Sequence, residues 1–174
     1  VYIHKAIVDK GSINTGDVIK MSVEKEKRSA IAIHHSSTHL VHAALRAVLG
    51  DHVQQKGSLV DENKLRFDFS HTKPLTKEEI TKIEDIVNKE ALKNLEVKTE
   101  LMKLDDALKS GAMALFGEKY DDDVRVLTMG ENSYSVELCG GTHVNRTGDI
   151  GFFVITNQSS VASGIRRIEA LAGS

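Results

Sequence analysis

The chain has 174 residues, 40% of them hydrophobic, and a formal net charge of −2. This length can bury one substantial core, or one core and a small satellite module. The single cysteine excludes an internal disulfide, and no apolar run approaches the roughly 18 residues that a membrane span needs. With no signal peptide either, we expect a cytoplasmic protein without a membrane partner. Contact with a nucleic acid would require a local basic patch, because the molecule as a whole offers no electrostatic attraction.

The first 28 residues predict a small β-module. Apolar runs at residues 1–3, 6–8 and 18–19 alternate with turn residues, which is typical of short antiparallel strands. About three strands cannot form a stable barrel by themselves. We therefore interpret residues 1–28 as a partial small β-barrel whose opening strands lie upstream, since the chain begins with Val1 rather than Met. The charged residues 24–28 are expected to be a solvated linker.

Residues 29–174 predict a second and larger domain, which begins with a helix over residues 32–49. Apolar side chains recur there at helical spacing, and Gly50 closes the pattern. His35 and His39 lie on the first turns of this helix. The apolar positions are Leu40, Ala44, Leu45 and Val48.

Two strands and a second helix follow. Residues 57–60 are followed by residues 64–69, where apolar positions 65, 67 and 69 alternate with Arg66 and Asp68, as in a half-buried strand. The charged face of this strand either pairs within the sheet or, in the interpretation we prefer, faces a substrate. Thr76 and Glu79 form a capping-box pattern after Pro74, which predicts that a helix begins there.

The remaining elements are mostly strands. We expect strands at residues 95–104, 124–129, 134–138 and 150–155, and a strand or a short helix at 165–171. Asp105 is expected to cap a short helix that ends near residues 110–111. Together these elements predict an α+β fold, with helices packed on a mostly antiparallel sheet.

Four side chains predict a metal site. His35 and His39 stand at i and i+4, so that both imidazoles share one face of the helix. Cys139 and His143 are separated by a Gly-Gly pair, which allows a tight bend. One thiolate and three imidazoles suit Zn²⁺. The alternative is that Cys139 is a buried small hydrophobe and the histidines are incidental.

Seven motifs carry a resemblance to a known family. They are residues 35–39 (HSSTH), 55–60 (QKGSLV), 66–71 (RFDFSH), 111–120 (GAMALFGEKY), 139–143 (CGGTH), 147–151 (TGDIG) and 164–170 (GIRRIEA). In these motifs the chain resembles the editing domain of alanyl-tRNA synthetase over essentially its whole length, with residues 1–28 resembling the small β-barrel that precedes that domain. The editing domain of threonyl-tRNA synthetase shares the metal quartet, but its cysteine motif usually differs from CGGTH.

The resemblance implies hydrolysis of the ester that joins a wrong amino acid, serine or glycine, to the 3′ end of alanine tRNA. The partners would be that mischarged tRNA and the remainder of the synthetase. Ester hydrolysis needs an activated water and a polarised carbonyl, which a zinc ion with an open coordination position supplies. Four protein ligands would close a tetrahedral zinc, so the metal must expand its coordination or only position the substrate.

Two polar residues are candidate catalytic groups. Thr38 and Gln55 can exchange hydrogen bonds with the hydroxyl of serine, which would leave buried polar groups unpaired when alanine enters. The alternatives are a Thr38 hydroxyl bonded to the preceding helical turn and an exposed loop amide at Gln55. Glycine has no hydroxyl, and no residue accounts for its recognition. The candidate tRNA-binding cations are Lys56, Arg66, Arg166 and Arg167. Adjacent strand residues face opposite ways, so at most one of the last two should face RNA and the other should pair with Glu169 or another acid.

Three other functions compete with this interpretation. A zinc protease would need a glutamate directly after the first histidine, where this chain has Ser36, and is therefore disfavoured. A structural zinc module that binds tRNA without catalysis would show a closed four-ligand metal and no hydrolysis. A threonyl-type editing domain is the third.

Overall fold

The structure is a computed structural model that describes residues 3–114 and 119–173. Two antiparallel sheets and two long helices make up most of it, so the expected α+β class is confirmed. The part of motif 111–120 that covers residues 115–118 lies outside the described residues. In chain order the elements are α1 (Lys25–Leu49), β1 (Gln55–Val60), β2 (Leu65–Ser70), α2 (Lys77–Leu92), β3 (Lys98–Lys103), α3 (Leu104–Lys109), β4 (Asp123–Met129), β5 (Ser135–Leu138), η1 (Thr147–Ile150), β6 (Phe152–Ala162) and β7 (Ile165–Gly173).

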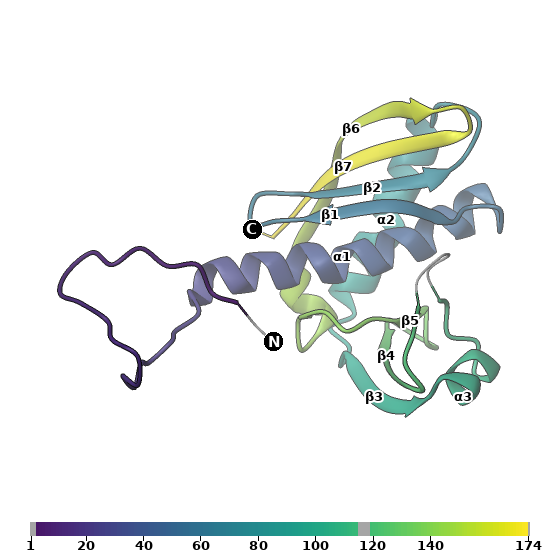
Figure 1. Cartoon of the computed structure of the whole chain (residues 1–174). Coiled ribbons are helices and arrows are strands. Elements are labelled where there is room, and N and C mark those ends of the chain that lie inside the picture. The colour runs from purple at the N-terminus through teal and green to yellow at the C-terminus, as the bar shows by residue number, and fades with distance from the viewer. Residues whose placement is uncertain (1–2, 115–118, 174) are drawn as a thin grey trace.

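Helix α1 runs between the two sheets (Figure 1). It begins at Lys25, seven residues earlier than expected, so the prediction of a linker at residues 24–28 is wrong. Lysine, glutamate and arginine are good helix formers, and they extend the helix into solvent beyond its packed part. The side chain of Lys27 on this extension lies 2.8 Å from the Glu62 carboxylate.

The first sheet has the strand order β1-β2-β7-β6, with each neighbouring pair antiparallel. The apolar positions predicted for its second strand are confirmed, since Leu65, Phe67 and Phe69 are fully buried in the main core, but Asp68 on the other face is buried too. Burying side chains of this size contributes about 1.5–3 kcal/mol each. Helices α1 and α2 pack together against this sheet, and β7 is a strand rather than a short helix.

Helix α2 begins as the sequence predicts. Thr76 is its N-cap and accepts a hydrogen bond from the Glu79 backbone N–H, while the Glu79 carboxylate accepts one from the Thr76 backbone N–H. This reciprocal cap satisfies two backbone donors and fixes the start of the helix. Ile83, Val87 and Ala91 then carry its buried face.

The second sheet, β3-β4-β5, departs from prediction at its edge. Strand β3 begins at Lys98 rather than residue 95, and Leu101 is 80% exposed, so its alternation does not mark a buried face. Strand β6 begins at Phe152, after a 3₁₀ turn that contains Ile150. Helix α3 begins at Leu104 with Lys103 as its N-cap. Asp105 therefore lies in the first turn, where its charge favours the helix dipole, and the predicted cap at this residue is wrong.

The expected β-barrel module is not confirmed. Residues 3–24 contain no strand, and their side chains are exposed. Isolated strands that find no partner are not stable, which explains why the alternating pattern alone forms no sheet here. Within the described ranges, no helix combines the length and the apolar character that a membrane crossing requires.

Candidate metal centre

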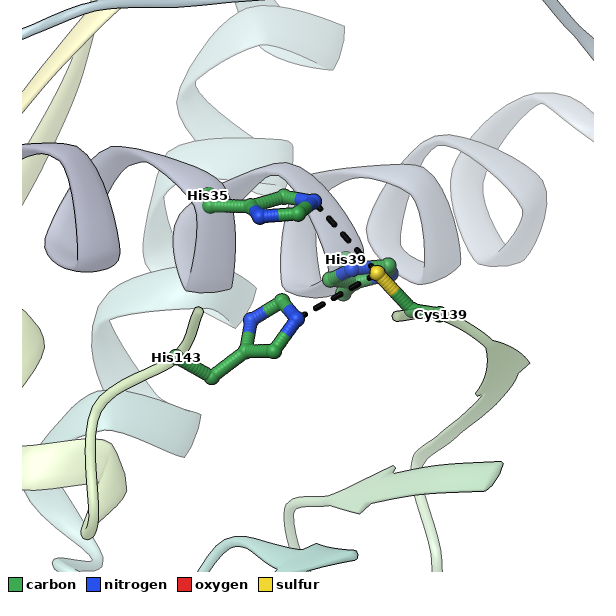
Figure 2. Close-up of side chains that lie close together, drawn as sticks. All are labelled: His35, His39, Cys139 and His143. Atoms are coloured by element: carbon green, nitrogen blue, oxygen red, sulfur yellow. Dashed lines mark hydrogen bonds between the residues drawn. The ribbon is translucent and has the colours of Figure 1, made fainter. Parts of the chain in front are cut away.

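Four side chains from two distant segments converge on one point (Figure 2). His35 and His39 come from α1, while Cys139 and His143 come from the segment that follows β5. One ligand atom from each lies within 4.8 Å of the other three. Cys139 Sγ lies 3.5 Å from His35 Nε2 and 3.3 Å from His143 Nε2. The convergence predicted from the two motifs is therefore present.

The thiol of Cys139 is poised to ionise. Burial opposes its ionisation, but hydrogen bonds from His143 and His35, together with the nearby imidazole of His39, outweigh burial and lower its pKa to about 3. A thiol with this pKa is a thiolate at neutral pH, which is the form that binds a metal. The pKa of His143 is lowered, chiefly by burial, so its imidazole is neutral and can also be a ligand.

A buried carboxylate supports His39 from behind. Glu137 Oε2 lies 2.8 Å from His39 Nδ1, and both side chains are almost completely buried. Burial raises the pKa of Glu137, but the charge and hydrogen bonds of His39 and His42 lower it to about 2. Burial would lower the pKa of His39, whereas Glu137 and Cys139 raise it to about 10. The ionised carboxylate accepts a hydrogen bond from Nδ1–H. Nε2, on the opposite side of the ring, therefore points away from Glu137.

The loop that carries Cys139 and His143 is held by contacts from both sides. Arg125 on β4 donates hydrogen bonds to the carbonyl oxygens of Gly140 and Gly141, at 3.2 and 2.6 Å. On the other side, Ser36 Oγ accepts from the Val144 backbone N–H and lies 3.3 Å from His143 Nδ1. These contacts pack the loop against α1.

Gly141 has a role that differs from the tight bend expected of it. Neither Gly140 nor Gly141 has a positive φ. A Cβ built at Gly141 would overlap the His35 ring, whereas one at Gly140 meets nothing within 4 Å. Gly141 is therefore required because its backbone passes directly against a ligand ring.

The donor set fits a single metal ion of tetrahedral preference. The buried His39 Nε2 has no hydrogen-bond partner among the described residues. Buried polar atoms are rarely unpaired, so a missing partner is consistent with a metal ligand. Zinc bonds of about 2.0–2.3 Å place tetrahedral ligands about 3.3–3.7 Å apart. The Cys139 distances of 3.3 and 3.5 Å match this spacing.

The two candidate catalytic residues are placed differently. Gln55, the first residue of β1, lines a cavity of about 260 Å³ together with His42 and Val53. The Thr38 hydroxyl is buried and donates to the His34 carbonyl at 2.9 Å. This is the alternative that the sequence left open for Thr38, so its role toward a substrate stays a prediction.

The four candidate tRNA-binding cations lie on strands of the first sheet, and each of them already has a polar partner. Arg167 donates two hydrogen bonds to the Asp68 carboxylate, at 2.6 and 2.8 Å, and Arg66 lies 3.6 Å from it. Strands β2 and β7 pair so that Asp68 and Arg167 stand opposite each other. The charged face of residues 66 and 68 is therefore internally paired.

The last two cations are Lys56 and Arg166. Lys56 is exposed on β1 and donates to Gln54, and Arg166 contacts the Gln158 side chain at 3.3 Å. Arg167 pairs with an acid, as expected for one member of the 166–167 pair.

Sequence reasoning missed Glu137, His42, Ser36 and Arg125. Two signals were available in the sequence. His42 stands three residues after His39 and so shares its helix face, and Glu137 stands two residues before Cys139 on the same side of a strand. Arg125 had no such signal, because its role depends on the pairing of β4 with β5.

Comparison with known proteins gives the class first. Residues 124–169, which include Cys139 and His143, match the family described as the threonyl and alanyl tRNA synthetase second additional domain. Over 99% of its length the chain is 56% identical to the alanine–tRNA ligase of Ruthia magnifica. It is 57% identical to that of Pseudomonas fluorescens and 58% identical to that of Rickettsia conorii, each also over 99% of the chain.

Over nearly its whole length the chain is therefore similar to one segment of alanine–tRNA ligases. The matched stretch covers 20% of the length of each of these relatives. The resemblance predicted from the seven motifs is confirmed.

Proposed function

We propose that the chain is an editing domain that hydrolyses alanine tRNA wrongly esterified with serine or glycine. The observation that carries this proposal is the convergence of His35, His39, Cys139 and His143. The family supplies the substrate class, because its relatives are named alanine–tRNA ligases. The unit responsible is residues 29–174, and its setting is the cytoplasm, with the remainder of a synthetase as its partner.

The four converging residues would hold one zinc ion. His39 would bind through Nε2 because Glu137 fixes its Nδ1 as a donor, and Cys139 would bind as the thiolate. When bound, zinc can polarise the ester carbonyl or lower the pKa of a water molecule. Arg125 holds the carbonyl groups of the ligand loop and so keeps Cys139 and His143 in place.

Gln55 would supply recognition of the amino acid. It lines the cavity that also contains His42, whose partner Glu137 supports the metal ligand His39. A hydrogen bond to the serine hydroxyl is lost when alanine enters, and such unpaired polar groups give strong rejection. Thr38 would add to this recognition only if its hydroxyl leaves the His34 carbonyl.

The tRNA would be held by cations on the first sheet. Lys56 is the most exposed of the candidates, because the side chains of Arg66, Arg166 and Arg167 are partly buried. Two guanidinium groups around one carboxylate still leave one net positive charge, which can attract phosphate.

One observation favours a second candidate, a structural zinc module that binds tRNA without catalysis. All four protein donors point at one centre, which would close a tetrahedral zinc. A threonyl-type editing domain has no comparable support, because the relatives named here are alanine–tRNA ligases.

A deacylation assay separates these functions. The full chain, loaded with zinc, is incubated with alanine tRNA charged separately with serine, glycine and alanine. We expect loss of the serine and glycine esters, persistence of the alanine ester, abolition by a chelator and recovery on adding zinc. A zinc-loaded chain that binds tRNA yet leaves seryl-tRNA intact would establish the structural module instead.

A further inference from the structure

His42 is a buried histidine that the metal site does not use directly. It is 4% exposed, and its Nδ1 lies 3.0 Å from Glu137 Oε1. The other oxygen of the same carboxylate lies 2.8 Å from His39 Nδ1. One carboxylate therefore orients two imidazoles, of which only one belongs to the four converging side chains.

The shared carboxylate fixes the tautomer of both rings. A carboxylate that contacts two imidazole nitrogens accepts a proton from each, so Nδ1 is the donor in His39 and in His42. In the neutral form of each ring, Nε2 is then the nitrogen that can accept a hydrogen bond or bind a metal. That of His39 faces the metal ligands, and that of His42 is buried without a hydrogen-bond partner among the described residues.

The residue that carries this unpartnered nitrogen lines a cavity. His42 lines a space of about 260 Å³ together with Arg46, Val53 and Gln55. The guanidinium of Arg46 already donates to the Asp51 and Val53 carbonyls and to the Asp51 carboxylate, so it does not satisfy His42. Drug-sized ligands occupy about 300–1,000 Å³, so this cavity suits a smaller group.

Leaving such a nitrogen unsatisfied is costly. A buried acceptor without a partner costs about 1–3 kcal/mol, and folded proteins rarely retain one without a reason. Substitution by an apolar residue would remove that cost, yet the chain keeps a histidine and places a carboxylate behind it. His42 Nε2 is therefore an acceptor that can bind a hydrogen-bond donor of a ligand.

We propose that His42 is a further substrate-binding residue, whose Nε2 accepts a hydrogen bond from an O–H or N–H donor of the aminoacyl-tRNA 3′ end bound in the cavity beside Gln55. This inference rests on the proposed function and names a contact within that site. The donor is the serine hydroxyl, or a group present with every amino acid, namely the ammonium or a ribose hydroxyl. The same contact would also fix the position of the Glu137 carboxylate, which orients His39.

Two variants isolate the contribution of His42 Nε2. His42→Asn keeps an amide N–H near the position of Nδ1, and with it the hydrogen bond to Glu137, but removes the acceptor at Nε2. His34→Asn is the matched control, because His34 is equally buried on α1 and also has an unpartnered Nε2. Its Nδ1 contacts the Asp61 carbonyl instead, away from the cavity.

The test measures binding rather than hydrolysis. Adenosine carrying serine or glycine through a 3′ amide, which cannot be hydrolysed as an ester, is titrated into zinc-loaded full chain by calorimetry. We expect His42→Asn to lower the affinity for the serine analogue by about tenfold, as for one lost hydrogen bond. The affinity of His34→Asn should match that of the unaltered chain. Weakening of the serine analogue alone identifies the hydroxyl as the donor, and equal weakening of both identifies the ammonium or the ribose.

Two results would overturn the inference. They are unchanged binding by His42→Asn, and failure of the unaltered zinc-loaded chain to bind either analogue. Hydrolysis of seryl-tRNA by the unaltered chain is measured in parallel. If that hydrolysis occurs while His42→Asn binds normally, the role of His42 fails and the editing function stands. If the analogue result holds but no ester is cleaved, the editing function fails and the binding site stands.

Discussion

His39 Nδ1 and Glu137 Oε2 lie 2.8 Å apart in a part of the core where both side chains are almost completely buried. The pair connects helix α1 to strand β5, which ends just before Cys139. It also decides which nitrogen of His39 faces the other ligands. The position of a metal ligand in this chain therefore depends on a carboxylate that is not itself a ligand.

Replacing this carboxylate should weaken metal binding. Glu137→Gln keeps the size of the side chain but exchanges one acceptor oxygen for an N–H donor, so His39 and His42 can no longer both donate to it. Loss of such a supporting partner typically costs 10–100-fold in metal affinity. We expect a zinc affinity about 10–100-fold lower in competition with a chromophoric chelator. Glu131→Gln, at an exposed carboxylate paired with Lys93, is the control and should bind zinc normally. Equal affinity in both variants would contradict the role of Glu137.

The glycine pair offers an internal comparison. Gly141→Ala should displace the His35 ring, because the new Cβ would overlap it, while Gly140→Ala adds a Cβ that meets nothing within 4 Å. We expect the first variant to bind less than one zinc per chain, or to bind it at least tenfold more weakly, and the second to bind like the unaltered chain. Metal analysis after dialysis gives the stoichiometry. Identical zinc content in the two variants would show that the loop is free to move away from α1.

Zinc binding should release about one proton near neutral pH. The pKa of His39 is raised to about 10, so its imidazole is protonated at pH 7 and must lose that proton to become a ligand. The pKa of Cys139 is lowered to about 3, so it is already a thiolate and releases none. Below pH 10 a proton on His39 competes with the metal. The zinc affinity therefore falls by about tenfold for each unit by which the pH is lowered. Calorimetry in buffers of different ionisation enthalpy measures the proton count. Release of two protons would show that Cys139 is still a thiol.

The ion pair across β2 and β7 should matter for stability. Asp68 is 6% exposed and accepts two hydrogen bonds from Arg167. Asp68→Asn would leave Arg66 and Arg167 without a countercharge, and because both guanidinium groups are about a third exposed, we expect a loss of about 1–3 kcal/mol in the free energy of unfolding. Urea unfolding provides the measurement. Asp123→Asn removes a largely exposed pair with Lys103 and should change that free energy by no more than about 0.5 kcal/mol. Similar effects in the two variants would contradict the account of the sheet.

Much of the fold was predictable because local signals agreed with the packing. The Thr76 and Glu79 cap and the buried Phe67 and Phe69 were both correct, since each depends on near neighbours in the sequence. Strand β3 was misjudged because it is an edge strand, where an apolar residue such as Leu101 need not face a core. The described residues 3–24 contain none of the strands expected there, because a strand needs a partner that a short pattern does not specify.

The site was predictable in its ligands but not in their support. His35 with His39, and Cys139 with His143, carry their spacing within single short motifs. Glu137 and Gly141 acquire their roles only when β5 meets α1, which joins the partners His39 and Glu137 although they stand 98 positions apart in the chain. Such contacts are properties of the tertiary structure, and the two-residue spacing of Glu137 and Cys139 indicates only that they share one side of a strand.

The most direct test of this account is the coordination of the metal itself. The full chain is purified with zinc, its metal content is measured, and X-ray absorption is recorded at the zinc edge. We predict one zinc per chain, with one sulfur at about 2.3 Å and imidazole nitrogens at about 2.0–2.1 Å, and loss of the sulfur shell in Cys139→Ala. A chain that retains no stoichiometric zinc, or a zinc without any sulfur neighbour, would contradict the claim that these four side chains form a metal centre.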